Sequence, residues 1–239
     1  MSTPPSQLEL VQGVVLPRPV GVDPVLDFLN TRSGWVGRGP ARSEWLTSYE
    51  AFVIWNGYVS LLSEATEVRL IEQAAVKPTD ATRRLDVARE FRADLYDVLT
   101  DQRVAGSFEA VARAVDRATA RRRLVAVPAG AHGLGAAWDL PEDLGLPLDQ
   151  LALLAADLLT SPTRDQVRLC AGDACGWLFL DPRGRRRWCS MSTCGNRAKV
   201  RAPRRPDSVI RRDEEAAIGE RNPVGEGQLK RAGSTRIQV

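Results

Sequence analysis

Cysteine occurs four times in this 239-residue chain, at Cys170, Cys175, Cys189 and Cys194. The spacing is C-x4-C-x13-C-x4-C. In a reducing cytosol, cysteines paired in this way bind metal more often than they form disulfides. Four thiolates suit Zn²⁺, which takes tetrahedral sulfur ligands in closed structural sites, and Gly172 and Gly176 would let the first pair form a tight turn. The pattern predicts one zinc ion per chain; two disulfides, four unpaired thiols or an iron–sulfur cluster are the alternatives.

The sequence offers little else for catalysis. His132 is the only histidine, and it lies in a glycine-rich stretch where an exposed loop residue is expected. A catalytic zinc keeps an open position and usually takes His or carboxylate ligands, and a Ser/His/Asp set also needs a histidine. The glycine-rich stretches 34–39 and 130–135 lack the Lys-Ser/Thr of a phosphate-binding loop. The sequence therefore predicts that the protein is not an enzyme.

Positive charge is concentrated around the second cysteine pair. The chain has 33 basic and 30 acidic residues, so its net charge is only +3. The stretch from Pro182 to Pro206 contains no acid and nine bases: Arg183, Arg185, Arg186, Arg187, Arg197, Lys199, Arg201, Arg204 and Arg205. Like charges this close repel one another unless an anion meets them, and the phosphate backbone of nucleic acid is the usual partner. A solvated basic face, or arginines that only neutralise the thiolates, would explain the same charge.

Two groups of these side chains are the candidate nucleic-acid contacts. Arg185, Arg186 and Arg187 are predicted on the return strand of a hairpin with residues 177–180, and all three are expected to hold phosphates. The first and third should share one face of the strand and the second should lie on the other. A short helix is predicted to start near Cys194, and it carries Asn196, Arg197, Lys199 and Arg201. Asn pairs with adenine and Arg with guanine, although Asn196 could equally bond its own backbone. DNA is the expected partner, and RNA is the alternative because charge alone does not distinguish the two.

The cysteine-rich segment resembles a known family. Its sequence, Cys170-AGDA-Cys175-GWLFLDPRGRRRW-Cys189-SMST-Cys194-Gly195-Asn196-Arg197, is similar to the CGNR zinc finger, which is named after the last four residues. In that family the finger usually follows an ABATE domain, described as a stress-induced transcription regulator, and the piece Val25–Thr31 resembles the start of such a domain. The resemblance covers residues 20–203. It implies a bacterial DNA-binding regulator whose N-terminal domain senses or dimerises while the finger contacts DNA.

Helical spacing of apolar residues predicts the elements that must position this site. Helices are expected within residues 45–53, 61–68, 79–99, 107–118 and 148–159, and a short hairpin within 124–127 and 136–138. Thr79-Asp80 and Ser107 are the predicted starts of the third and fourth helices. The predicted fold class is mostly α with minor β: a helical N-terminal domain followed by a treble-clef-like four-cysteine zinc finger.

Composition divides the chain into four segments. Residues 1–20 contain four prolines and are expected to be an extended arm. Residues 21–165 form the helical ABATE-like domain and residues 166–202 the CGNR-type finger, each with its own core. Residues 203–239 contain no aromatic residue, so a disordered tail is predicted.

The remaining features concern partners and location. Five aromatic residues belong either to the core or to a small-molecule pocket: Trp35, Trp45, Tyr49, Trp55 and Tyr58. No apolar run approaches the roughly 18 residues of a membrane span and no signal peptide is recognised, so a cytoplasmic protein with no membrane partner is expected. A homodimer is compatible with the sequence. The alternative functions are a protein–protein adaptor and a small-molecule-binding protein in which the finger is only structural.

Overall fold

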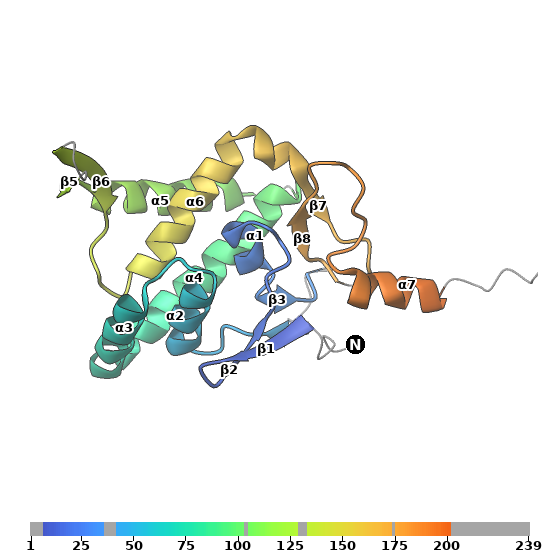
Figure 1. Cartoon of the computed structure of the whole chain (residues 1–239), viewed down its shortest axis with the longest axis horizontal. Helices are drawn as coiled ribbons and strands as arrows, with labels where there is room; N and C mark the ends of the chain where they lie inside the picture. Colours follow the sequence, from blue (N-terminus) through green and yellow to red (C-terminus); the bar gives the residue numbers. More distant parts are fainter. Residues whose placement is uncertain (1–6, 36–41, 103–104, 129–132, 174, 202–239) are drawn as a thin grey trace, which may run out of the picture. The chain divides into compact units, whose positions relative to one another are not determined.

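The computed structural model describes residues 7–35, 42–102, 105–128, 133–173 and 175–201 (Figure 1). Helices make up most of this part of the chain: α1 (Pro24–Leu29), α2 (Tyr49–Tyr58), α3 (Glu64–Val76), α4 (Pro78–Leu99), α5 (Ser107–Arg121), α6 (Leu146–Thr160) and α7 (Asn196–Arg201). The strands form two-stranded antiparallel ladders: β1 (Leu8–Val11) with β2 (Val14–Pro17), β3 (Arg32–Ser33) with β4 (Ser43–Glu44), β5 (Arg123–Pro128) with β6 (Leu134–Asp139), and β7 (Val167–Leu169) with β8 (Leu178–Leu180). The predicted fold class, mostly α with minor β, is confirmed. His132 and the predicted tail lie outside the described residues.

The first residues of α2, α4 and α5 can be compared with the predicted helix starts. α2 starts at Tyr49, later than predicted, because the Ser48 side chain accepts a hydrogen bond from a backbone N–H of its first turn. α4 starts at Pro78, so Thr79-Asp80 lies inside its first turn and does not cap it. α5 starts at Ser107, as predicted. Among the described residues, no helix is both long enough and apolar enough to span a bilayer.

Residues 8–17 form a hairpin, not the extended arm expected for residues 1–20. Gln12 and Gly13 make its two-residue turn with positive φ angles of 46° and 82°, as a type I′ turn requires. Leu16 is fully buried, so the hairpin is part of the packed structure. The sequence did not predict this hairpin because two four-residue strands show little alternation and the neighbouring prolines indicate irregular chain.

α1 is a short helix that apolar spacing did not predict. The Asp23 side chain caps it by accepting hydrogen bonds from the N–H groups of Val25 at 2.8 Å and Leu26 at 3.3 Å. Pro24 occupies the first position, where its missing N–H costs nothing. Six residues are too few to display a helical repeat, yet the residues of α1 after Pro24 are all buried.

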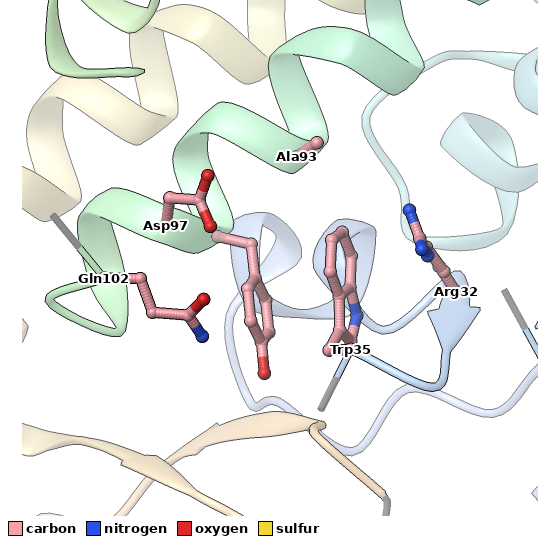
Figure 2. A pocket seen from close by; sticks show the side chains of 6 residues that line it. Arg32, Trp35, Ala93, Asp97 and Gln102 are labelled. Atoms are coloured by element: carbon pink, nitrogen blue, oxygen red, sulfur yellow. The ribbon is translucent and has the colours of Figure 1, made fainter. Parts of the chain in front are cut away.

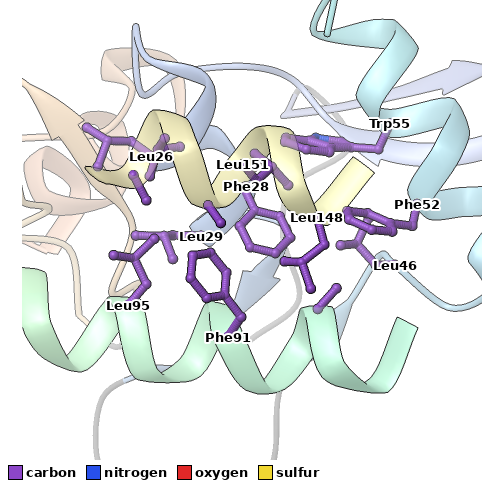
Figure 3. Close-up of a cluster of buried hydrophobic side chains, with 14 of the residues drawn as sticks. Leu26, Phe28, Leu29, Leu46, Phe52, Trp55, Phe91, Leu95, Leu148 and Leu151 are labelled. Atoms are coloured by element: carbon purple, nitrogen blue, oxygen red, sulfur yellow. The ribbon is translucent and has the colours of Figure 1, made fainter. Parts of the chain in front are cut away.

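The hydrophobic core is built around α1, with α4 and α6 on either side (Figure 3). The Phe28 ring lies 5.9 Å from the Phe52 ring, 5.6 Å from Trp55 and 6.4 Å from Phe91, measured between ring centroids. Four of the five early aromatic residues are buried in this cluster and Tyr58 packs against it. These aromatic residues therefore serve the core.

The same cluster continues into the cysteine-rich segment. Trp177, Leu178 and Phe179 are at most 2% exposed and belong to the buried cluster that contains α1 and α4. The Trp177 ring meets the Trp45 ring edge-on, with centroids 6.0 Å apart. The finger and the helices therefore share one core, contrary to the expectation of separate cores. A segment of this size is too small to bury such side chains alone.

Candidate metal centre and basic surface

The four cysteine sulfurs form one compact cluster. All four Sγ atoms lie within 4.8 Å of one another; Cys189 Sγ is 3.7 Å from Cys175 Sγ and 3.6 Å from Cys194 Sγ. A tetrahedron with Zn–S bonds of about 2.3 Å has edges of about 3.8 Å, so these separations fit a single zinc ion. None of the four cysteines is in a disulfide. An iron–sulfur cluster places several iron and sulfide ions between its thiolates and would hold them farther apart.

The first cysteine pair lies in the turn between β7 and β8. β8 contains the residues of the predicted hairpin, but its partner is β7, which precedes Cys170. The predicted return strand at residues 185–189 is wrong, because this segment has no strand structure. Its backbone instead wraps around Asp181, whose carboxylate accepts the Arg186 N–H at 2.8 Å. β7 therefore pairs with β8 in place of residues 185–189, which were the predicted partner.

Two glycines make room for this turn, as predicted. A Cβ at Gly172 would lie 2.9 Å from Cys194 Sγ, inside the sulfur cluster. A Cβ at Gly176 would lie 2.7 Å from the Trp35 Cβ, and Gly176 has a φ of +71°, which L side chains rarely adopt. Any side chain at either position would therefore push the metal site apart or away from the helical part.

The second pair, Cys189 and Cys194, leads directly into a helix. Residues Met191–Gly195 form one π-helical turn that continues as α7, so the predicted helix near Cys194 is confirmed. The Cys189 N–H donates to Cys170 Sγ at 3.2 Å, which joins the two cysteine pairs through backbone as well as through the metal site. The orientation of α7 is therefore set by the last metal ligand.

Side-chain donors surround the sulfurs and offset their negative charge. Arg197 Nη2 donates to Cys194 Sγ at 3.1 Å, and Gln7 Nε2 donates to Cys189 Sγ at 3.7 Å. Hydrogen bonds from the neighbouring cysteines, Cys170 first, and from Arg197 lower the pKa of Cys194 below the ordinary thiol value. Because only the thiolate binds zinc, the Arg197 and Gln7 donors favour the metal-binding form.

Two of the predicted nucleic-acid contacts are engaged inside the protein. The Arg186 guanidinium stacks over the Phe179 ring, 4.2 Å from its centroid. It also donates hydrogen bonds to three backbone carbonyls, those of Val20, Trp188 and Cys189. Arg197 is bound to a metal-site sulfur. Both arginines therefore have structural partners that the sequence did not reveal.

The other predicted contacts lie on an exposed loop and on α7. Three arginines of the loop after β8 are exposed: Arg183, Arg185 and Arg187. Lys199 and Asn196 are exposed on α7. Asn196 Nδ2 also donates to the Ser192 carbonyl at 3.3 Å, which is the backbone role expected as its alternative. Arg201 belongs to α7, but its side chain lies outside the described residues.

Side chains of the helical part hold the metal-binding segment, and these side chains were not among the predicted site residues. Asn30 Nδ2 donates to the Leu178 carbonyl, and Asn30 Oδ1 accepts the Leu178 N–H, each at 2.9 Å. The Tyr96 hydroxyl donates to the Gly176 carbonyl at 2.8 Å. The one signal for Asn30 was its place in the piece Val25–Thr31 that resembles an ABATE domain, whereas Tyr96 lies in a helix whose pattern indicated only core.

A small cavity lies beside Tyr96 (Figure 2). It is lined by Arg32, Trp35, Ala93, Tyr96, Asp97 and Gln102. The Trp35 and Tyr96 rings are stacked, with centroids 4.0 Å apart. Figure 2 shows Trp35 between Arg32 on one side and Asp97 and Gln102 on the other. The cavity volume is about 190 Å³, below the roughly 300–1,000 Å³ of typical small-molecule sites. The cavity therefore gives little support to a small-molecule function.

Comparison with known families agrees with the order of the two parts. Residues 22–162 match the ABATE family, described as "Putative stress-induced transcription regulator", and residues 166–205 match the CGNR zinc finger. No curated protein matches the chain. Neither family description names an enzymatic activity. The first match covers more than half of the 239 residues and the second contains all four cysteines. The chain therefore belongs to the ABATE family and carries a CGNR zinc finger after that domain.

Proposed function

We propose that this protein is a bacterial, cytoplasmic DNA-binding transcription regulator in which the zinc finger contacts DNA and the helical domain senses a signal or dimerises. The observation that carries the proposal is a set of exposed basic side chains in the loop before Cys189 and on α7 after Cys194. We define the basic surface as four of these side chains, namely Arg183, Arg185, Arg187 and Lys199. No acidic residue lies between Pro182 and Pro206, so nothing in this stretch neutralises them.

The three arginines of the basic surface suit phosphate groups. Their loop is closed by Asp181, which accepts the Arg186 N–H, and by the Arg186 guanidinium, which binds the Val20 carbonyl. The backbone is thus held while the neighbouring side chains stay in water. Each arginine that meets a phosphate releases condensed counterions from the DNA, which supplies affinity that depends on salt and not on sequence.

α7 is the element suited to read bases. It begins directly after the last metal ligand and carries Asn196, Lys199 and Arg201. Asn pairs with adenine, and Lys or Arg with guanine, in the major groove, which admits a helix. Arg197 shares this helix but already binds Cys194, so we assign it first to the metal site.

A salt titration tests the proposal. The zinc-loaded protein is titrated into a labelled duplex, and the dissociation constant is measured at increasing KCl concentration. Three phosphate contacts, one for each arginine of the basic surface, predict a slope of about −2.7 in log affinity against log salt, at about −0.9 per contact. Arg185→Ala should reduce the slope by about one and weaken all sequences alike. Arg113→Ala removes an exposed arginine of α5 and should leave the slope unchanged.

Two results would contradict the proposal. A protein–protein adaptor would show no salt-dependent binding to the duplex. Tighter binding to single-stranded RNA of the same length, lost in the same Arg185→Ala variant, would assign the basic surface to RNA.

A further inference from the structure

The hairpin of β5 and β6 exposes a face on which six cross-strand side chains are apolar. Side chains alternate across a strand, and cross-strand partners point to the same side. Six partners in register therefore share a face: Leu124 with Trp138, Ala126 with Ala136, and Pro128 with Leu134. All six are exposed, and the fractions reach 64% for Leu124, 80% for Leu134 and 60% for Trp138. We define these six side chains as the hairpin face.

The hairpin lacks a third strand among the described residues. Its sheet consists of β5 and β6, and Figure 1 shows it beyond the end of α5, joined by a loop to the start of α6. An isolated two-stranded hairpin is at best marginally stable in water. A contiguous apolar surface on such an element is typical of a contact site.

Charge decides which partner fits the hairpin face. None of its six side chains is charged, so these six side chains offer no ion pair to phosphate or to a charged peptide. The charged groups lie at its base, where Arg122 stacks 4.4 Å from the Trp138 ring centroid and Arg123 stands opposite Asp139. An uncharged apolar surface is complementary to another of its kind, and every copy of this chain presents one.

We propose that two copies of this chain associate through their hairpin faces, packed against each other around a two-fold axis. In an antiparallel arrangement the Trp138 end of one face covers the Leu134 end of the other, and the small pair Ala126–Ala136 meets its own copy at the centre. The basic residues 121–123 of the two copies then lie at opposite ends of the contact, which reduces their repulsion. Such an isologous contact closes at two copies.

The area of the hairpin face determines how strong this dimer is. Six side chains of these types present roughly 500 Å² of apolar surface per copy, near the upper end for a patch on a monomer. Two copies would bury about 1,000 Å², at the lower limit of specific interfaces. We therefore expect a dimer that forms with a dissociation constant in the micromolar range and responds to protein concentration.

Sedimentation velocity of the full-length, zinc-loaded protein tests the proposal. Without DNA, the weight-average mass should rise from monomer towards dimer between about 1 and about 200 µM, and added salt should not weaken the association because the contact is apolar. Leu134→Glu should raise the dissociation constant at least tenfold, since a two-fold interface buries the new charge twice. Leu134→Met should keep the dimer.

Val76→Glu is the matched control. Val76 is 79% exposed at the end of α3, outside the hairpin, so this variant should dimerise like the parent. A monomer at every concentration would overturn the proposal. The partner of the hairpin face would then be another segment of the chain or another protein. A dimer that is equally strong in Leu134→Glu would also overturn it. Because the measurement uses no DNA, failure of the dimer and failure of DNA binding are separate results.

Discussion

Asn30 and Leu178 stand 148 positions apart and exchange two hydrogen bonds, each 2.9 Å long. The side-chain amide of Asn30 donates to the carbonyl and accepts from the N–H of the same residue, as the backbone of a neighbouring strand would. Asn30 is also the C-cap residue of α1. One side chain thus joins the central helix of the core to the strand that follows the first cysteine pair.

Asn30→Ala should lower the free energy of unfolding by about 2–4 kcal/mol, because both backbone groups of Leu178 would be buried without partners. Urea denaturation followed by circular dichroism measures this. Asn196→Ala removes an exposed amide and should change the stability by no more than about 0.5 kcal/mol. Equal stability of Asn30→Ala and the parent would show that the reciprocal pair contributes nothing.

Removing zinc should destabilise the helices together with the finger. The purified protein should contain one zinc ion per chain, and a chelator should release it. Trp177 and Phe179 then lose their fixed place in the shared core, and a loss of about 3–5 kcal/mol would lower the melting temperature of the helical signal by about 10 °C. Two separate transitions, with the helical one unchanged by the chelator, would contradict the shared core.

Arg186 and Arg187 are neighbours with different expected roles. Arg186→Ala should destabilise the protein by about 2–3 kcal/mol, because it leaves three carbonyls without their donor. Arg187→Ala should leave the stability within about 0.5 kcal/mol of the parent and reduce the salt slope of DNA binding by about one. Thermal melts and salt titrations of both variants distinguish the roles; the same phenotype in both would refute the division.

Arg197 and Lys199 allow a similar comparison on α7. Arg197→Ala removes a donor to Cys194 Sγ and should weaken zinc binding about tenfold, measured by competition with a chromogenic chelator. Lys199→Ala should leave zinc affinity unchanged and weaken DNA binding. If Arg197→Ala keeps its zinc affinity and loses DNA, Arg197 is a DNA contact and not a support of the metal site.

Asp27 gives stability a pH dependence of predictable sign. Burial raises the pKa of Asp27 from 3.8 to about 6, although the carboxylate accepts the N–H groups of Val20 and Gly21. The folded state therefore binds the proton more tightly than the unfolded state does. This contribution to stability is complete below about pH 4 and is lost as the pH rises through 6, by about 2–3 kcal/mol.

Asp27→Asn isolates this contribution because the amide does not titrate. The difference in unfolding free energy between the parent and Asp27→Asn should change between pH 4 and 7 and stay constant above pH 7. Taking the difference cancels the titration of the cysteines, which both proteins share. A difference that is constant over the whole range would show that Asp27 has an ordinary pKa.

The metal site and the longer helices were predictable because their signals lie in neighbouring residues. The cysteine spacing and the apolar repeats of α4, α5 and α6 are local patterns. α1 and the β1–β2 hairpin were too short to show such a pattern. β8 could pair with β7 or with residues 185–189, and no local sequence pattern decides between these two partners.

The candidate nucleic-acid contacts were predictable as a group and not one by one. Arg186 and Arg187 have the same type and adjacent positions, and they differ only in partners that the fold brings from elsewhere, such as Val20 for Arg186. Arg197 lies in the predicted helix near Cys194, and its contact with the Cys194 sulfur appears only once α7 is placed beside the metal site.

Gly176 lies close to Trp35, and the Gly176 carbonyl accepts a hydrogen bond from the Tyr96 hydroxyl. These contacts mean that the finger cannot be moved to another protein by itself. A segment of residues 166–205 grafted onto another protein would carry all four metal ligands and leave their supports behind. An engineer who wishes to transplant the site must move α1 and the end of α4 with it. For the same reason, recombination during evolution would have to transfer the helical part and the finger together.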